Sequence, residues 1–242
     1  MRVSRMPHNQ LRRLAAVIAL AGALIAPGIT HSPAALAQQN LISGGGRQAI
    51  AWTGNAVVTT AVDLSGNLDF WYQPISASGF WNQQTVASAS GGVTYGGPSI
   101  AWTGNAVVIT VTDNSGNLYF WWQRNGTVPW NQETVATGYT EEGYFEPAIA
   151  WTGGAALITA VSNGGNLDFW WQRDGDSAWN QETASVPDQQ GGTFFTPSIA
   201  WAPSGWQGGG AALITAADST GNLDFWFQLD GTSLWNQETV AS

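Results

Sequence analysis

One motif occurs four times in this chain and limits what it can fold into. The motif reads Gly-Asn-Leu-x-Phe-Trp-aromatic-Gln, and its copies occupy residues 66–73, 116–123, 165–172 and 221–228. Each copy begins with a turn-forming pair and continues into an aromatic block of high β-propensity. Repetition at a fixed period is the signature of a repeat architecture, in which each repeat forms one structural unit.

Three other elements recur with the motif. An Ile-Ala-Trp segment precedes it, with its tryptophans at 52, 102, 151 and 201, and a run rich in small and β-branched residues follows. A Trp-Asn-Gln segment closes each copy. Every repeat thus reads as four short strands joined by tight turns. Four strands per repeat of about 50 residues predict an all-β fold, a β-propeller of four four-stranded blades.

The first 37 residues are predicted to be a bacterial signal peptide. Arginines at positions 2, 5, 12 and 13 precede an apolar run over 14–26, and Ala35-Leu36-Ala37 offers a cleavage site after Ala37. A secreted, extracellular protein follows, with Sec and twin-arginine export both open. Residues 38–242 are then one propeller domain, with blades at about 48–87, 98–136, 147–185 and 197–241.

Composition removes several functional classes. Beyond residue 37 the chain has no His, Lys or Cys, and it sets Arg47, Arg124 and Arg173 against 16 acidic residues. Such an acidic surface repels nucleic acid and anionic lipid, and no segment predicts membrane insertion. Thiol nucleophiles and imidazole bases are excluded. We expect no cofactor and no metal, since acidic pairs such as Asp174 and Asp176 do not recur.

The order of these elements resembles the sugar-binding β-propeller lectins. These include the fucose-binding lectins of fungi and bacteria and the tachylectin-like group. The local sequence is also similar to tandem repeats of secreted actinobacterial proteins. The similarity covers roughly residues 48–242 as a pattern. It implies shallow sugar pockets between neighbouring blades, with an aromatic ring stacked on the sugar.

The resemblance does not extend to fucose specificity. In the fucose binders an Arg of the second strand and a Glu of the third strand bind the sugar. Here the second strands have no Arg and the third strands have no Glu; Asp69, Asp168 and Asp224 are the carboxylates of the third strands, with Tyr119 in the remaining repeat. The resemblance therefore implies sugar binding without naming the sugar.

Strand alternation sorts the aromatic residues into structural and candidate ligand-binding sets. Leu118, Phe120 and Trp122 share one face of their strand, and Tyr119, Trp121 and Gln123 share the other. Leu118 and Phe120 are interpreted as structural. The candidates are the Trp-x-Gln positions of the third strand, the Trp-Asn-Gln segments, and an aromatic residue in three interblade connections. The predicted ligand-binding residues are Trp71, Gln73, Trp81, Asn82, Gln83, Tyr95, Trp121, Gln123, Trp130, Asn131, Gln132, Tyr144, Trp170, Gln172, Trp179, Asn180, Gln181, Phe194, Trp226, Gln228, Trp235, Asn236 and Gln237.

The favoured function is multivalent carbohydrate binding by a secreted, lectin-like protein whose partners are glycans or glycoconjugates. Polar groups that recur with each blade suit several equal weak sites, whereas catalysis needs one asymmetric set, so we expect no enzyme. Two alternatives stay open, a protein-binding or cell-surface scaffold and a carboxylate-dependent glycosidase or lyase. Four blades make a small ring, so a homodimer that completes a larger ring is also open.

Overall fold

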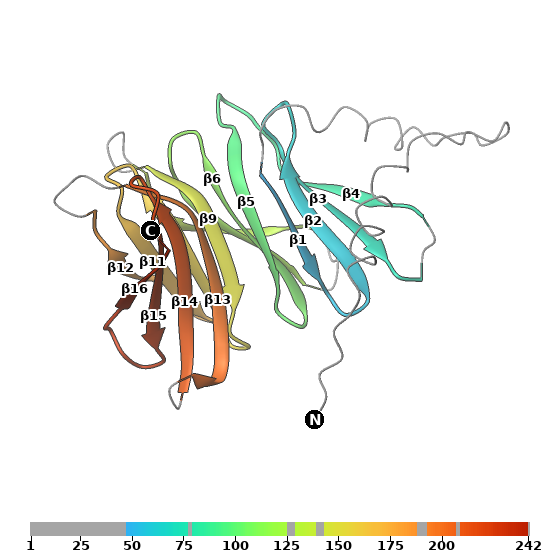
Figure 1. Ribbon diagram of the computed structural model, residues 1–242. Helices are drawn as coiled ribbons and strands as arrows, with labels where there is room; N and C mark the ends of the chain where they lie inside the picture. The colour runs from blue at the N-terminus through green and yellow to red at the C-terminus, as the bar shows by residue number, and fades with distance from the viewer. Residues whose placement is uncertain are drawn as a thin grey trace, which may run out of the picture. The chain divides into compact units, whose positions relative to one another are not determined.

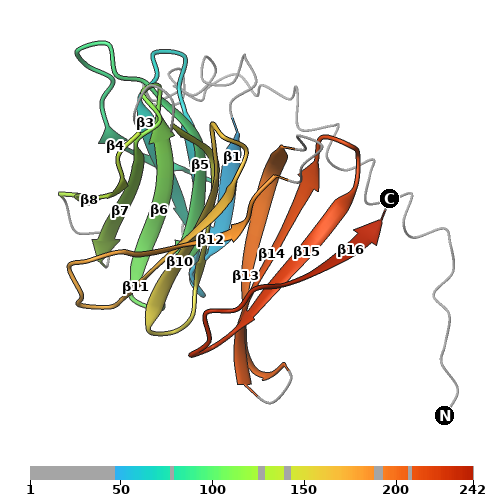
Figure 2. The ribbon, with the colours of Figure 1, turned by 90° about the vertical axis from the view of Figure 1, so that its left-hand side faces the viewer.

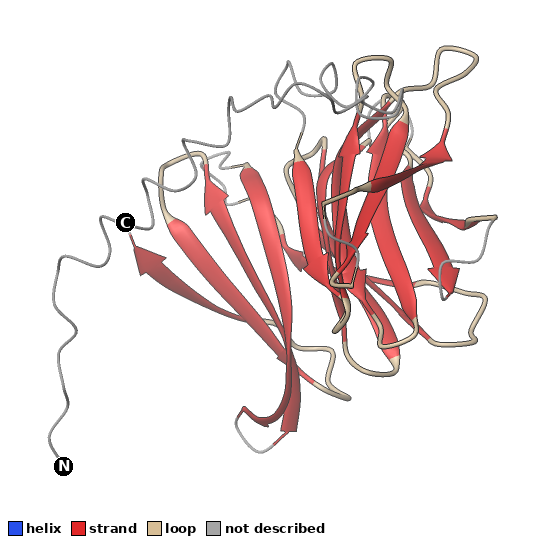
Figure 3. Cartoon of the chain, turned by 90° about the vertical axis from the view of Figure 1, so that its right-hand side faces the viewer, coloured by secondary structure: helices blue, strands red, loops and turns tan. Residues whose placement is uncertain are grey.

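The computed structural model of the chain describes residues 47–76, 79–124, 129–138, 143–187, 193–206 and 209–241. In these residues the regular structure consists of sixteen strands in four four-stranded antiparallel sheets, without a helix (Figure 3). The fold class predicted from the repeat, a β-propeller of four four-stranded blades, is confirmed. The predicted signal peptide, residues 1–37, lies outside the described residues.

Each blade is one continuous segment whose strands pair in sequence order. Blade 1 contains β1 (Gln48–Trp52), β2 (Ala56–Val62), β3 (Leu68–Pro74) and β4 (Asn82–Ala87). Blade 2 contains β5 (Tyr95–Trp102), β6 (Ala106–Asp113), β7 (Leu118–Arg124) and β8 (Asn131–Ala136). Blade 3 contains β9 (Tyr144–Trp151), β10 (Ala155–Ser162), β11 (Leu167–Arg173) and β12 (Asn180–Ser185). Blade 4 contains β13 (Phe194–Trp206), β14 (Gly209–Asp218), β15 (Leu223–Leu229) and β16 (Asn236–Ala241), seen side by side in Figure 2.

The innermost strands of blades 2 to 4 begin before the prolines that the sequence suggested as blade limits. Their pairing contains a β-bulge next to each proline, and the residue that precedes it has a positive φ in all three blades: Gly97, Glu146 and Thr196. A bulge lets the strand bend while pairing continues on both sides. The aromatics at 95, 144 and 194 are therefore strand residues and not connection residues.

Neighbouring blades share an apolar core at each of three boundaries. The innermost strands β1, β5, β9 and β13 follow one another in that order (Figure 1), and a cluster of buried side chains lies between each successive pair of blades. In the first cluster Leu68 and Phe70 of β3 pack with Trp121 of β7. The assignment of the Leu and Phe positions to structure agrees with this, because both faces of an internal blade are covered.

A polar contact repeats beside each of these cores, and we call it the interblade clasp. A side-chain oxygen on the outermost strand of one blade accepts a hydrogen bond from the third-strand Gln of the next blade. In two cases it also accepts one from the Trp of that blade's Trp-Asn-Gln segment. At the first boundary Gln84 Oε1 accepts from Gln123 Nε2 (2.8 Å) and Trp130 Nε1 (3.2 Å). At the second, Glu133 Oε2 accepts from Gln172 Nε2 (2.7 Å) and Trp179 Nε1 (3.1 Å). At the third, Glu182 Oε2 accepts from Gln228 Nε2 (2.6 Å).

The buried carboxyl group of Asp168 predicts an unusual pH dependence of stability. Burial raises its pKa above the ordinary 3.8, and the hydrogen bond from Thr183 Oγ1 (2.7 Å) only partly offsets this. A raised folded pKa favours the protonated form, so the stability it contributes is full below pH 3.8 and is lost as the pH rises through the folded pKa. We expect Asp168→Asn, which keeps an acceptor for Thr183, to raise the thermal midpoint at neutral pH.

Thermal unfolding between neutral pH and about pH 4 checks this prediction. The gain from Asp168→Asn should shrink as the pH falls, because the wild-type carboxyl group then takes up its proton. The exposed Asp176→Asn serves as the control and should change little. A variant at position 168 that is less stable than wild type at neutral pH would contradict the interpretation.

Candidate ligand-binding pockets between the blades

Two pockets lie at matching positions on successive blade boundaries. The large pocket, of about 560 Å³, lies between blades 3 and 4, and the small pocket, of about 330 Å³, lies between blades 2 and 3. Their linings correspond residue by residue through the repeat, so one local arrangement occurs twice. The large pocket is lined by Thr152, Phe169, Trp171, Arg173 and Glu182 of blade 3 and by Trp201, Gln228 and Asp230 of blade 4, among others. The corresponding residues of the small pocket are Thr103, Phe120, Trp122, Arg124, Glu133, Trp151, Gln172 and Asp174.

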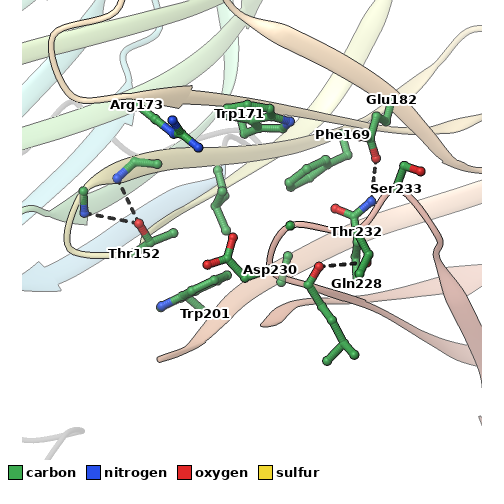
Figure 4. A pocket seen from close by; sticks show the side chains of 16 residues that line it. Thr152, Phe169, Trp171, Arg173, Glu182, Trp201, Gln228, Asp230, Thr232 and Ser233 are labelled. Atoms are coloured by element: carbon green, nitrogen blue, oxygen red, sulfur yellow. Dashed lines mark hydrogen bonds between the residues drawn. The ribbon is translucent and has the colours of Figure 1, made fainter. Parts of the chain in front are cut away.

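Two indoles and three charged groups, those of Arg173, Glu182 and Asp230, line the large pocket. Figure 4 shows Trp171 and Arg173, both from β11, on one side and Trp201 of β13 with Asp230 on the other. Both tryptophans are half-buried, which leaves part of each ring accessible. The Arg173 guanidinium carbon lies 5.8 Å from the centre of the Trp171 ring, within the range of a cation–π contact. Its charge therefore lies beside an indole that faces the pocket.

The small pocket has the same parts in a tighter arrangement. Its Arg124 forms an ion pair of 3.5 Å with Asp174 of the next blade, and both side chains are exposed. Exposed pairs of this kind contribute little to stability because water screens them. The pair is thus more notable for placing a guanidinium and a carboxylate at the rim than for holding the blades together.

The interblade clasp forms one wall of each pocket. Glu182 uses Oε2 for Gln228, and its Oε1 accepts no hydrogen bond from the described residues. Glu133 Oε2 likewise accepts hydrogen bonds from Gln172 and Trp179. A carboxylate held in this way keeps spare acceptor capacity at the wall of the pocket.

A threonine hydroxyl distinguishes the two pockets. Thr152 Oγ1 accepts hydrogen bonds from the backbone N–H of Gly154 (3.2 Å) and Ala155 (2.9 Å). The corresponding Thr103 also donates its proton to Asn105 Oδ1 at 2.8 Å, a contact that Gly154 cannot offer in blade 3. Within the described chain the Thr152 hydroxyl proton has no acceptor, so it is available to a ligand of the large pocket.

A glycine positions Trp201. A Cβ atom at Gly210 would lie 2.5 Å from Trp201 Cζ2 and 2.8 Å from Cη2, so a side chain there would collide with the indole. The Gly210 carbonyl also accepts the backbone N–H of Asp230 at 2.8 Å. The backbone at Gly210 therefore supports both residues that blade 4 places opposite Trp171.

The third-strand tryptophans predicted as ligand residues lie in the core. Trp71, Trp121, Trp170 and Trp226 are buried, and their indole N–H groups make no hydrogen bond. Two of the predicted strand aromatics pack on them edge to face, Tyr144 on Trp170 (5.0 Å between ring centres) and Phe194 on Trp226 (5.2 Å). The third, Tyr95, packs on Tyr119.

The predicted Trp-Asn-Gln residues lie at the blade boundaries and on the outermost strands. Trp130, Trp179 and Trp235 are half-buried and pack edge to face on the third-strand Phe of the preceding blade, while Trp81 is more exposed. The asparagines at 82, 131, 180 and 236 donate long hydrogen bonds of 3.4–3.5 Å to third-strand carbonyls. The glutamines at 83, 132, 181 and 237 are exposed, and Gln83 contacts Asp69.

Of the predicted residues, Gln172 and Gln228 line the two pockets. Gln123 lies in the first clasp, and Gln73 holds the same repeat position in blade 1. Whether any of the predicted residues binds a ligand stays a prediction.

The pocket residues that the sequence reasoning missed are Trp122, Trp171, Trp151 and Trp201. A signal for them was present, since Arg124 and Arg173 follow Trp122 and Trp171 by two residues, and Arg is rare in this chain. At the first blade boundary Tyr72 and Pro74 stand at the matching positions, so the arrangement is not repeated there.

Metal-ligand clusters and membrane-spanning helices are both absent from the described residues. No group of three or more His, Cys, Asp or Glu side chains in them is placed to hold a metal ion. They contain no helix with the length and apolar character needed to cross a membrane.

No protein-family model matches the chain, and no curated protein matches its sequence significantly. Its β-propeller fold is nevertheless shared with sugar-binding lectins of solved structure, which confirms the structural side of the resemblance. The BP39L lectin of Burkholderia pseudomallei matches with a TM-score of 0.59 and 18% identity, over 81% of this chain and 56% of that chain. The SapL1 lectin, solved with alpha methyl fucoside, matches with a TM-score of 0.59 and 9% identity, over 84% and 65%.

The sialidase of Trypanosoma rangeli, solved with sialic acid, is a similar structure from an enzyme. It matches with a TM-score of 0.56 and 12% identity, over 78% of this chain and 36% of the sialidase. The chain thus spans about half to two thirds of the lectins and about a third of the sialidase. At these identities the comparisons establish the fold alone.

Proposed function

We propose that this protein binds carbohydrate in its interblade pockets, as a lectin-like protein without catalytic activity. The observation that carries the proposal is the paired construction of the two pockets, each with a half-buried tryptophan from each of two blades beside an Arg and a Glu. An indole face suits the C–H face of a pyranose ring, and the charged and hydroxyl groups at the rim suit its hydroxyl groups. The lectins among the similar structures agree with this assignment.

Each pocket offers a different set of hydrogen-bonding groups to a sugar. The large pocket presents the free hydroxyl proton of Thr152, the guanidinium of Arg173 and the carboxylate of Asp230. The small pocket presents a Thr103 whose proton is engaged, and an Arg124 already paired with Asp174. We therefore propose two related sites of unequal affinity per chain, in place of four equal sites.

The test is a glycan array followed by calorimetry with the best monosaccharide or disaccharide. We expect binding at about millimolar affinity for a monosaccharide, because about 12 non-hydrogen atoms at about 0.3 kcal/mol each, the efficiency of drug-sized ligands, give about 4 kcal/mol. We expect about two sites per chain. The absence of binding to any sugar at about 10 mM would overturn the proposal and favour the scaffold alternative.

A glycosidase is the second candidate, favoured by the sialidase among the similar structures and by the two carboxylates of the large pocket, Glu182 and Asp230. Glycosidases place two carboxyl groups across the scissile bond. Incubation of the protein with labelled oligosaccharides should release no product. Turnover that disappears in Glu182→Gln while binding persists would assign the glycosidase function instead. Secretion, predicted from residues 1–37, stays part of the proposal.

A further inference from the structure

The innermost strand of the first blade exposes an apolar residue that every later blade buries. Ile50 of β1 is 72% exposed, whereas the equivalent Ile100, Ile149 and Ile199 are 7%, 6% and 9% exposed. In blades 2 to 4 this face packs against the preceding blade, as Ile100 and Trp121 do in the first core cluster. Trp52, beside Ile50, is also exposed. Ile50 and Trp52 of blade 1 therefore lie on a surface that, in the later blades, contacts a preceding blade.

The last blade exposes the complementary half. Leu223 of β15 is 39% exposed, whereas the equivalent Leu68, Leu118 and Leu167 are fully buried against the next blade. Val240 of β16 is 60% exposed, whereas Val86 at the same position of blade 1 is 8% exposed. The chain thus presents at one end the face that blades 1 to 3 use toward their successor.

The interblade clasp is divided between the same two ends. Glu238 of β16 occupies the acceptor position filled by Gln84, Glu133 and Glu182 in blades 1 to 3. Gln73 and Trp81 occupy the donor positions filled by Gln123 and Trp130 in blade 2. Among the described residues none of the side chains of Gln73, Trp81 and Glu238 makes a hydrogen bond within the chain. One complete clasp is therefore present as two separated halves.

We infer that a second copy of this chain joins these halves, so that blade 4 of each copy packs on blade 1 of the other. Glu238 would accept hydrogen bonds from Gln73 and Trp81 of the partner subunit, and Leu223 and Val240 would cover Ile50 and Trp52 of the partner subunit. The contact is head to tail and occurs twice, which closes two copies into one ring with two-fold symmetry. The fourth and eighth boundaries of that ring repeat the three within each chain.

Two copies together have eight blades, a number within the usual range for a propeller. Propellers contain about four to eight blades, so two copies give the upper limit and three copies would exceed it.

The new boundary serves assembly and not sugar binding. Leu229 of one copy would hold the position that Arg173 has in the large pocket and Arg124 in the small pocket. Pro74 of the partner subunit would lie opposite it. The guanidinium groups of the proposed sugar sites are absent there. The inference consequently does not depend on whether the protein binds a sugar.

The mass of the full chain in solution, measured by light scattering during size-exclusion chromatography, tests the inference. We expect the mass of two chains at about 10 µM for wild type and of one chain for Ile50→Asp, since the charge would be buried at the new boundary. The matched control is Leu64→Asp at a turn residue that is 64% exposed, which should remain two chains. A wild type of one chain, or of three or more, would overturn the inference, as would an Ile50→Asp variant that remains two chains.

A charge exchange tests the clasp itself. Glu238→Arg should weaken dimerisation by about tenfold or more, because it places a cation opposite the donors Gln73 and Trp81. Adding Gln73→Glu to the same chain should restore the dimer, since each Arg then meets a Glu of the partner subunit. Circular dichroism confirms that the variants are folded. Failure of the double variant to recover, with both single variants folded, would overturn the pairing of these residues.

Discussion

Trp170→Ala is expected to lower the free energy of unfolding by about 3–5 kcal/mol, the usual cost of emptying a buried tryptophan site. Trp170 is almost fully buried in the core between blades 2 and 3, where it packs with Leu118 and Ile158 and meets the edge of Tyr144. Because its indole N–H makes no hydrogen bond, the loss is one of packing alone. Denaturant unfolding of the isolated protein measures it.

The neighbouring residue provides the control for this prediction. Trp171 is half-buried and lines the large pocket, so Trp171→Ala removes fewer packed atoms and should cost clearly less stability. Equal losses for the two variants would contradict the division of the Trp-Trp pair into a core residue and a pocket residue. A loss larger at position 171 would reverse it.

The second large effect concerns ligand binding. Trp171→Ala should remove the large pocket as a sugar site, and Trp122→Ala the small one, because each deletes one of the two indoles that line its pocket. Loss of such an aromatic contact typically costs about 2 kcal/mol or more, about thirtyfold in affinity. Calorimetry should therefore show the number of sites falling from two to one in each single variant and to none in the double variant.

Tyr72→Ala is the matched control for these substitutions. Tyr72 holds the same repeat position in blade 1, but Pro74 replaces the arginine there. The variant should keep both sites with unchanged affinity. Loss of binding in Tyr72→Ala, or unchanged stoichiometry in Trp171→Ala with the protein folded, would contradict the assignment of the pockets.

The sequence contains enough information to predict the blades. The Leu, Phe and Trp of the Gly-Asn-Leu-x-Phe-Trp motif fix the third strand, and the turns on either side fix its neighbours. The bulges were not predicted, because Glu146 and Thr196 adopt a positive φ that is uncommon for their residue types. The innermost strands of blades 2 to 4 therefore begin before prolines that would ordinarily mark their first residue.

The sites were harder to predict than the fold, for a physical reason. Alternation separates the faces of a strand, as with Trp121 and Trp122, but in a propeller a neighbouring blade covers each face. Which indole reaches solvent therefore depends on how the neighbouring blade packs on each face. Trp122 and Trp171 line the pockets, whereas Trp121 and Trp170, one residue earlier on the same strands, are buried. Distances between blades are set by packing, which no single repeat encodes.

All four strands of each blade come from one uninterrupted segment, and this has a consequence for how such proteins can change. No blade borrows a strand from another, so each segment of about 50 residues carries both of the faces it needs. Duplication or deletion of one segment in a gene would create boundaries whose two sides already match, because contacts reach only the nearest neighbours. Rings of different circumference are thus accessible by single recombination events, while individual pockets diverge by substitution at a few rim positions.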